Sequence, residues 1–312
     1  MRRAYSGGLP ECDGAVTSSP DPGRQTGPGA VHRVAVSAFA RLPPGARRSV
    51  LHALGRYAPW EDGFDPTPPS PHAHEVTGPP DFVGVGAQKA GTTWWFDAIC
   101  AHPEVYARAD IHKERHFFDR YALREFGAAE CSLYRGWFPR PAGSLTGEWT
   151  PDYIQWAWVP PLLAQAAPQT RILVLLRDPV ERFRSGLAHQ RRDRGRLTAE
   201  STQDALTRGF YHQALARWTE QFRPEQMLVL QYEHCRADPQ GQLNRTFRFL
   251  ELEPVAVEGL QDRVNLTTNT FDLSEGVRRR LVEIYESDVR ALLEQFPWLD
   301  VGLWPNFVSL AR

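Results

Sequence analysis

The stretch that decides the fold of this chain spans residues 82–95 and has the sequence FVGVGAQKAGTTWW. A short apolar run rich in valine leads into a loop of small residues, which leads into a pattern typical of a helix. Such a strand–loop–helix junction brings together the unpaired N–H groups of the helix and the positive end of its dipole. Phosphate groups bind at such points. The stretch therefore predicts a phosphate-binding loop.

The side chains of this loop suit an anion. Gly86 and Gly91 let the backbone approach a ligand closely, Lys89 carries a positive charge, and Thr92 and Thr93 carry hydroxyl donors. The glycine spacing matches a nucleotide P-loop, but Thr92 stands where a P-loop has its lysine. The alternative interpretation is a plain glycine turn between a buried strand and a helix, with Lys89 in solvent.

Residues 88–94 resemble the 5′-phosphosulfate loop of sulfotransferases that use 3′-phosphoadenosine 5′-phosphosulfate (PAPS). The resemblance implies a domain that binds this donor and releases 3′-phosphoadenosine 5′-phosphate (PAP). It implies donor-binding roles for Gln88, Lys89, Ala90, Gly91, Thr92, Thr93 and Trp94.

A second motif, IHKERHFFD, spans residues 111–119. In an extended segment Glu114 and His116 point to the same side. By composition alone, the segment is a charged surface turn anchored by its two phenylalanines. It also resembles the catalytic segment of heparan-sulfate type sulfotransferases, which implies Glu114 as general base, with His116 and Asp119 either supporting it or contacting the acceptor. The alternative within the same mechanism makes His116 the base and Glu114 its orienting partner.

The proposed role of Glu114 carries an expectation about its pKa. A carboxylate with an ordinary pKa of about 4 is a weak base. The role therefore implies a partly buried Glu114 whose pKa is raised by its surroundings. A third motif, GEWTPDY at residues 147–153, resembles the segment that lines the acceptor cleft in the same family.

The run RILVLL at residues 171–176 predicts a strand buried on both faces of a parallel sheet. Asp178 suits the cap of a following helix, and Arg177 lies at the carboxyl end of the strand, where open α/β sheets bind ligands. The resemblance implies that Arg177 and Ser185 bind the 3′-phosphate of the donor. A Walker B strand with Asp178 on magnesium is the alternative, which the neighbouring arginine and the missing P-loop lysine disfavour.

The later part of the chain continues the alternation, with a helix after Gly209, a strand at 227–233 and a helix ending near Leu250. Residues 263–304 resemble the closing segment of bacterial family members. We predict a single α/β sulfotransferase domain over residues 79–312, with a P-loop-like central parallel sheet and helices on both faces. Residues 1–78 form a Pro/Gly-rich extension, with disorder in 1–30, two short helices within 31–60 and a linker over 61–80.

Composition limits the possible partners. The 312 residues carry a net charge of −1, which gives no overall attraction to nucleic acid or anionic membranes. The 4 cysteines are widely spaced, so neither a zinc site nor a disulfide framework is indicated. No run approaches the ~18 apolar residues of a membrane span. A cytoplasmic location follows as the default prediction.

One local basic run, His189–Arg196, is a solvated helix end or a flap near the cofactor or an anionic acceptor. The near-neutral net charge argues against a long polyanionic acceptor unless a local basic groove binds it.

Together these resemblances imply sulfuryl transfer from PAPS to a hydroxyl or amine of a carbohydrate or small metabolite. Lys89 would stabilise the leaving phosphate, and no metal is required. The alternatives are a P-loop kinase and a non-catalytic nucleotide- or glycan-binding module.

Overall fold

The computed structural model of the chain describes residues 66–261 and 271–311. These residues belong to one compact unit, Trp60–Arg312. The predicted disorder of residues 1–30 and the predicted helices within 31–60 lie outside the described residues. The domain boundary at residue 79 stays a prediction.

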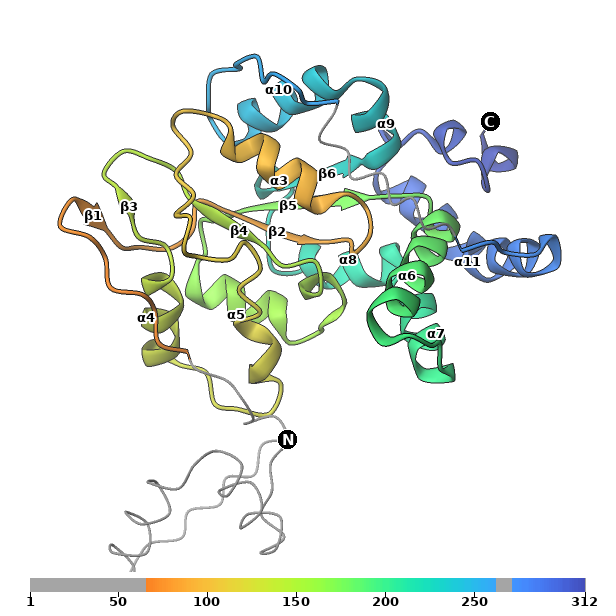
Figure 1. Ribbon diagram of the computed structural model, residues 1–312, viewed down its shortest axis with the longest axis horizontal. Helices are drawn as coiled ribbons and strands as arrows, with labels where there is room; N and C mark the ends of the chain where they lie inside the picture. The colour runs from red at the N-terminus through yellow and green to blue at the C-terminus, as the bar shows by residue number, and fades with distance from the viewer. Residues whose placement is uncertain (1–65, 262–270, 312) are drawn as a thin grey trace, which may run out of the picture. The chain divides into compact units, whose positions relative to one another are not determined.

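A four-stranded sheet lies at the centre of this unit (Figure 1). Its neighbouring strands are all parallel, and the order is β4-β2-β5-β6. The strands are β2 (Phe82–Gly86), β4 (Gly147–Trp149), β5 (Arg171–Leu176) and β6 (Met227–Gln231). The predicted α/β fold with a P-loop-like central parallel sheet is confirmed.

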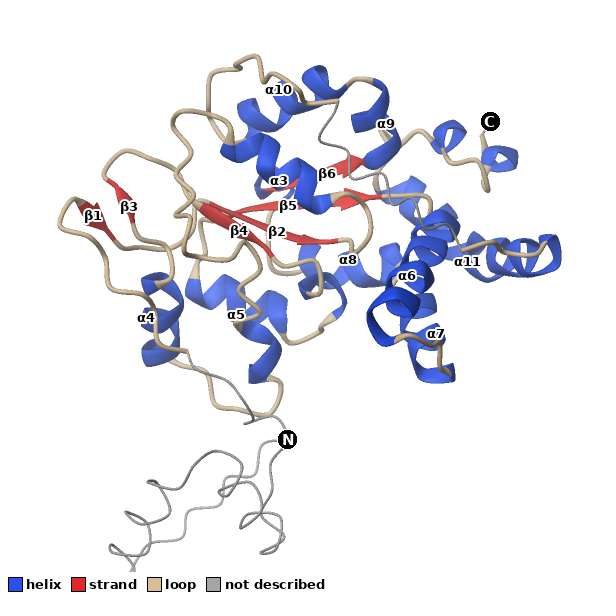
Figure 2. Cartoon of the chain, in the orientation of Figure 1, coloured by secondary structure: helices blue, strands red, loops and turns tan. Residues whose placement is uncertain are grey.

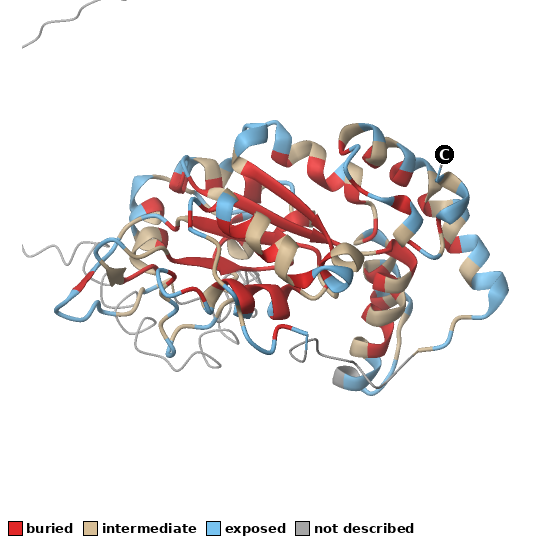
Figure 3. Ribbon diagram, turned by 90° about the horizontal axis from the view of Figure 1, so that it is seen from above, coloured by how far each residue is buried: buried red, intermediate tan, exposed pale blue. Residues whose placement is uncertain are grey.

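Most residues of the strands are apolar, as expected for a parallel sheet that helices cover on both faces. Every residue of β2 and β6 is buried, and Figure 3 shows the sheet as the buried centre of the fold. The predicted strand at 171–176 is confirmed as β5. The strand predicted at 227–233 ends two residues earlier, since Tyr232 begins helix α9 (Tyr232–Ala237).

A glycine sets the contact between β2 and β4. A Cβ atom at Gly84 would lie 2.0 Å from the ring of Trp149. This indole is fully buried, and its Nε1 donates to the carbonyl oxygen of Gly86 at 3.3 Å. The pairing of the two strands therefore depends on the absence of a side chain at residue 84.

Helices flank the sheet on both faces, as Figure 2 shows. Helices α3, α9 and α10 lie on one face, while α5 and α8 lie on the other (Figure 1). Besides α9, the part of the chain that the structure describes has these helices of eight or more residues: α3 (Thr92–Cys100), α4 (Ala128–Gly136), α5 (Val159–Ala166), α6 (Pro179–Arg194), α7 (Ala199–Thr207), α8 (Tyr211–Thr219), α10 (Pro239–Phe249) and α11 (Glu275–Gln295). Within residues 66–261 and 271–311, no helix has the length and apolar character to cross a membrane.

The described part of the N-terminal segment contacts the domain through a small antiparallel sheet. Strand β1 (Glu75–Val76) pairs with β3 (Arg140–Pro141). The Glu75 carboxylate is buried, where it accepts a hydrogen bond from the Tyr106 hydroxyl at 2.8 Å and pairs with Arg108 at 3.2 Å. Residues just before position 79 are thus held by specific polar contacts.

Candidate active site

The loop between β2 and α3 has the backbone of an anion-binding turn. Lys89 and Gly91 both have positive φ angles, of 68° and 89°. Gly91 is the N-cap of α3, and a Cβ there would lie 2.8 Å from the Tyr232 ring. Glycine is therefore required both by the left-handed backbone and by the close approach of Tyr232. The N-terminal amides of α3 follow directly at Thr92 and Thr93.

The turn after β5 brings a second cation to the same edge of the sheet. The Arg177 guanidinium lies 4.9 Å from the centre of the Tyr232 ring, and its Nη1 donates to the Lys89 carbonyl oxygen at 3.2 Å. These contacts fix Arg177 beside the loop that carries Lys89. Ser185, on the following helix α6, lines the same pocket.

Asp178 is the N-cap of α6, as predicted. Its Oδ1 accepts hydrogen bonds from the amides of Val180 at 2.9 Å and Glu181 at 3.2 Å. Its Oδ2 accepts from the backbone and side chain of Asn306. Both carboxylate oxygens are occupied, so the Walker B alternative has no support from this geometry.

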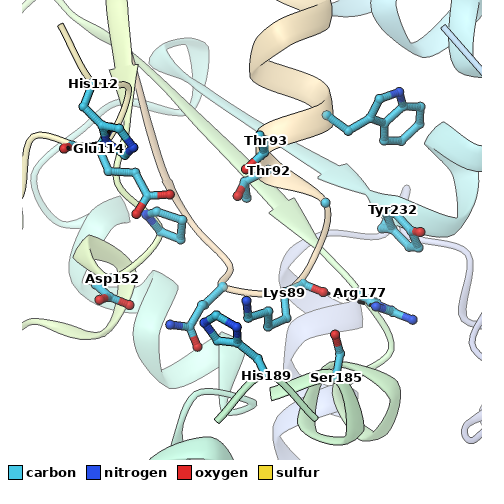
Figure 4. Close-up of a pocket in the computed structure, with 14 residues that line it drawn as sticks. Lys89, Thr92, Thr93, His112, Glu114, Asp152, Arg177, Ser185, His189 and Tyr232 are labelled. Atoms are coloured by element: carbon cyan, nitrogen blue, oxygen red, sulfur yellow. Dashed lines mark hydrogen bonds between the residues drawn. The ribbon is translucent and has the colours of Figure 1, made fainter. Parts of the chain in front are cut away.

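These elements open into one pocket of about 440 Å³, seen in close-up in Figure 4. The pocket is lined by Gln88, Lys89, Gly91, Thr92, Thr93, Trp94, His112, Glu114, Pro151, Asp152, Arg177, Ser185, His189 and Tyr232. Nine of the predicted site residues are among them. The other three, Ala90, His116 and Asp119, do not line it.

Sequence reasoning missed five of the lining residues. Pro151 and Asp152 lie in the segment predicted to line the acceptor cleft, and His112 and His189 lie in two further segments that the sequence singled out. Tyr232 carried no signal, because its role depends on the end of β6 reaching the glycine loop. Four of the five could therefore have been found from the segments that the sequence singled out, whereas Tyr232 could not.

His116 contacts Glu114 and Asp119 contacts His116, although neither of the two lines the pocket. The Nε2 atom of His116 lies 3.3 Å from Glu114 Oε2, and its Nδ1 lies 2.6 Å from Asp119 Oδ2. The Lys113 ammonium donates to the other oxygen of Glu114 at 2.6 Å. The Glu114 carboxylate thus faces the pocket, and each of its two oxygens contacts a cationic group, either Lys113 or His116.

The pKa values of Glu114 and His116 shift in opposite directions. Partial burial raises the pKa of Glu114, but hydrogen bonds with His116 and Lys113 outweigh it and lower the pKa to about 2. Hydrogen bonds with Asp119 and Glu114 raise the pKa of His116 to about 10. The expectation of a raised Glu114 pKa is wrong, because the fold places two cations against this carboxylate. At neutral pH Glu114 is ionised and His116 is protonated.

The His116 shift predicts a pH dependence of stability. The pKa of His116 is raised from an ordinary 6.5 to about 10. Its ion pairs therefore stabilise the fold fully below the lower value, and this contribution is lost as the pH rises through the higher one. In urea unfolding at about pH 6, 8 and 10, the difference in free energy between wild type and His116→Asn should shrink with pH.

Asparagine is the suitable replacement because residue 116 has a φ of 50°, which asparagine tolerates. A difference between the two proteins that stays constant from about pH 6 to 10 would contradict the raised pKa.

Side chains of the motif at residues 147–153 accept hydrogen bonds from the backbone of the segment that carries Glu114 and His116. The Thr150 hydroxyl accepts hydrogen bonds from the amides of Arg115 at 3.0 Å and His116 at 3.4 Å. It donates to Glu148 Oε2 at 2.6 Å. The Tyr153 hydroxyl accepts from the next amide, that of Phe117, at 2.9 Å. The backbone beside Glu114 is thus fixed by buried side chains.

Glu148 is the buried centre of this support. Its side chain is fully buried, and burial raises its pKa. The Tyr134 hydroxyl donates to its Oε1 at 2.7 Å, while Thr150 donates to its Oε2. Of the predicted acceptor-cleft segment, therefore, Pro151 and Asp152 line the pocket, and Glu148, Thr150 and Tyr153 position the neighbouring segment.

The pocket has two chemically different ends. In Figure 4, Arg177, Ser185 and Tyr232 lie on one side of Lys89 and the two threonines, and His112, Glu114 and Asp152 lie on the other. Below, the first side is called the donor end and the second the acceptor end, after the roles that we propose for them. The predicted basic run covers the last turns of α6, where Arg191 and Arg192 are exposed and Arg192 contacts His189 at 2.7 Å.

Comparisons with known proteins identify the family of this chain. A family model for the sulfotransferase domain matches residues 79–273, more than half of the chain. Human heparan sulfate glucosamine 3-O-sulfotransferase 3B1 is 29% identical over 229 residues, covering 66% of this chain and 56% of that protein. Human bifunctional heparan sulfate N-deacetylase/N-sulfotransferase 3 is 27% identical over 200 residues, covering 56% of this chain and 22% of that protein. The chain spans about half the length of the curated 3-O-sulfotransferases it matches.

A solved structure has the same fold. The crystal structure of a sulfotransferase from Alicyclobacillus acidocaldarius aligns with a TM-score of 0.59 at 22% sequence identity. The alignment covers 72% of this chain and 98% of that chain. With the family model matching from the glycine loop through both later motifs, this chain belongs to the sulfotransferase domain family.

Proposed function

We propose that this protein transfers a sulfuryl group from PAPS to a hydroxyl or amine of a carbohydrate or small-metabolite acceptor. One observation carries the proposal. A single pocket unites a glycine loop at a helix N-terminus, two cations at the edge of the sheet, and an ionised carboxylate opposite them. When bound, PAPS supplies the sulfuryl group, whose bond to the 5′-phosphate oxygen breaks as the acceptor atom bonds to sulfur.

The donor end fits a bisphosphorylated nucleotide. The amides and hydroxyls of Thr92 and Thr93 hold the 5′-phosphosulfate, at a loop that a side chain on Gly91 would obstruct. Arg177 and Ser185 bind the 3′-phosphate. Lys89 lies between the two ends and compensates the charge that develops on the leaving phosphate oxygen.

The acceptor end supplies the base. Glu114 faces the pocket and is ionised at neutral pH, so its carboxylate can accept the proton of the acceptor. His116 is protonated below its pKa of about 10 and has no lone pair to offer. This favours Glu114 over His116 as the base, with Asp119 holding His116 in place.

The low pKa of Glu114 also constrains the order of events. A carboxylate with a pKa of about 2 does not deprotonate a hydroxyl in the ground state. The acceptor proton becomes acidic only as its oxygen bonds to sulfur. Proton transfer to Glu114 therefore accompanies or follows bond formation, and in-line placement of the two substrates supplies most of the catalysis.

The test is turnover of ³⁵S-labelled PAPS with pooled carbohydrate and small-metabolite acceptors in the presence of EDTA. We expect PAP and a labelled product to form without magnesium. Hydrolysis of ATP that requires magnesium would support the P-loop kinase alternative. Binding of PAP with no transfer to any acceptor would support a non-catalytic module. The cytoplasmic location stays a prediction.

A further inference from the structure

We propose that Asp152 determines the charge of the acceptor, and that the acceptor is a neutral or positively charged compound rather than a sulfated or carboxylated chain. This inference rests on the proposed function, because it concerns the acceptor end of the same pocket. The acceptor proposed for this chain differs in charge from heparan sulfate, the polyanion that the names of the matched enzymes specify.

The position of Asp152 is the first observation. The residue follows the Thr150–Pro151 turn, and its carboxylate lines the acceptor end together with Glu114, with 23% of its side chain exposed. Asp152 is also close to the two residues that contact or orient Glu114. One ring nitrogen of His116 and one carboxylate oxygen each of Asp119 and Asp152 lie within 4.8 Å of one another. A molecule that presents its hydroxyl or amine to Glu114 therefore lies in the same end of the pocket as the Asp152 carboxylate.

Arg208 fixes this carboxylate without covering it. Its Nη1 pairs with Asp152 Oδ1, and its Nε pairs with Asp204 Oδ2 at 2.8 Å. Among the described residues, no hydrogen bond to the Asp152 Oδ2 atom is found. One oxygen of Asp152 is thus oriented, and the other is available to a donor group of the acceptor, such as a hydroxyl or an ammonium.

The cations at this end are already paired. Lys113 binds Glu114, and His116 lies between Glu114 and Asp119. Arg208 is shared between two aspartates. Within the described part of the pocket, the acceptor end therefore offers carboxylates to an incoming molecule and no lysine or arginine without an acidic partner.

The cations of the donor end do not make the pocket favourable for an anionic acceptor, because the bound donor is itself negatively charged. Lys89 and Arg177 are its two lining cations among the described residues. A phosphate monoester alone carries a charge of about −1.5 to −2 at neutral pH, and PAPS carries its phosphosulfate as well. With the donor bound, an anionic acceptor meets negative charge from both directions, and like charges in a confined site disfavour binding.

The exposed basic run at the end of α6 is the competing site for an anion. Arg191 and Arg192 are exposed, and neither lines the pocket. They could bind a polyanion that extends out of the pocket. The experiment separates this outcome from the proposal.

The test uses the full chain saturated with PAP, so that the donor end is occupied. Three tetrasaccharides serve as probes: one of glucosamine (cationic), one of N-acetylglucosamine (neutral) and one containing glucuronate (anionic). We expect the cationic and neutral probes to bind at least about tenfold more tightly than the anionic probe. Asp152→Asn should reduce this difference in affinity, because the asparagine amide keeps an oxygen for Arg208 but carries no negative charge.

Asp204→Asn is the matched control. It removes the same charge from the other partner of Arg208, which does not line the pocket, and should leave the difference in affinity unchanged. The wild-type order of affinities tests the proposal even if a variant fails to fold. Three results would overturn the proposal. The anionic probe could bind as tightly as the others, no probe could bind, or Asp152→Asn and Asp204→Asn could change the difference in affinity equally. Loss of anionic-probe binding in Arg192→Ala would then assign the anion to the basic run.

Failure of the proposed function would be visible separately. If wild-type protein does not bind PAP at all, the donor site is wrong. If PAP binds and the anionic probe is preferred, only the acceptor assignment is wrong.

Discussion

The Glu114→Gln variant is expected to lose about 10²- to 10⁴-fold in kcat while keeping its affinity for PAP, because an amide cannot accept the proton of the acceptor. Glutamine has nearly the same shape, and its one carbonyl oxygen can still accept a hydrogen bond from Lys113 or from His116. The donor end on the other side of the pocket should be unaffected. The measurements are PAP release from PAPS with a productive acceptor, and PAP affinity by titration calorimetry.

Glu225→Gln is the control for this variant. Glu225 is exposed and precedes β6, so it lies at the opposite end of that strand from the pocket. Its substitution should leave kcat unchanged. Near-normal turnover in Glu114→Gln would remove Glu114 as the base and would reopen the assignment to His116.

The Lys89→Gln variant is expected to lower kcat by about 10²- to 10³-fold, because the positive charge compensates the leaving phosphate oxygen as the bond to sulfur breaks. Its effect on PAP affinity should be smaller, about tenfold, since the amides of α3 and Arg177 still bind the nucleotide. Comparing kcat with PAP affinity separates a transition-state role from simple donor binding.

A control cation is available near the same pocket. Arg236 is exposed, and its Nη1 lies 3.5 Å from the Tyr232 hydroxyl, but it does not line the pocket. Arg236→Gln removes one positive charge from the neighbourhood and should change kcat little. If Lys89→Gln and Arg236→Gln lose activity equally, Lys89 acts through long-range electrostatics and not through contact with the leaving phosphate.

The sequence predicted the parts of the fold that depend on local pattern. The apolar run at 171–176 and the capping Asp178 fixed the position of β5 and the start of α6. Strand β4 was not predicted, because its three residues include Glu148, which is polar. Its burial depends on hydrogen bonds from Tyr134, 14 residues away, and from Thr150.

The site was predictable where a motif carried its residues and unpredictable where the fold brought separate segments together. The glycine loop, Arg177, Ser185 and Glu114 meet in one pocket as predicted. The pKa of Glu114 was predicted in the wrong direction. The sequence shows that a lysine and a histidine flank Glu114, but the contacts of both with its carboxylate are seen only in the folded structure, where His116 has a φ of 50°.

The central claim is that Arg177 and the glycine loop form a site for a nucleotide with both a 3′- and a 5′-phosphate. Calorimetric titration without magnesium, using PAP and AMP on wild type and Arg177→Ala, tests it most directly. Arg184→Ala is the control, because Arg184 pairs with Glu181 on the same helix and does not line the pocket. Wild type and this control should prefer PAP over AMP, and Arg177→Ala should lose about 10- to 100-fold in PAP affinity, as expected for lost hydrogen bonds to a charged group. Equal binding of PAP and AMP by wild type, or binding of neither, would contradict the account.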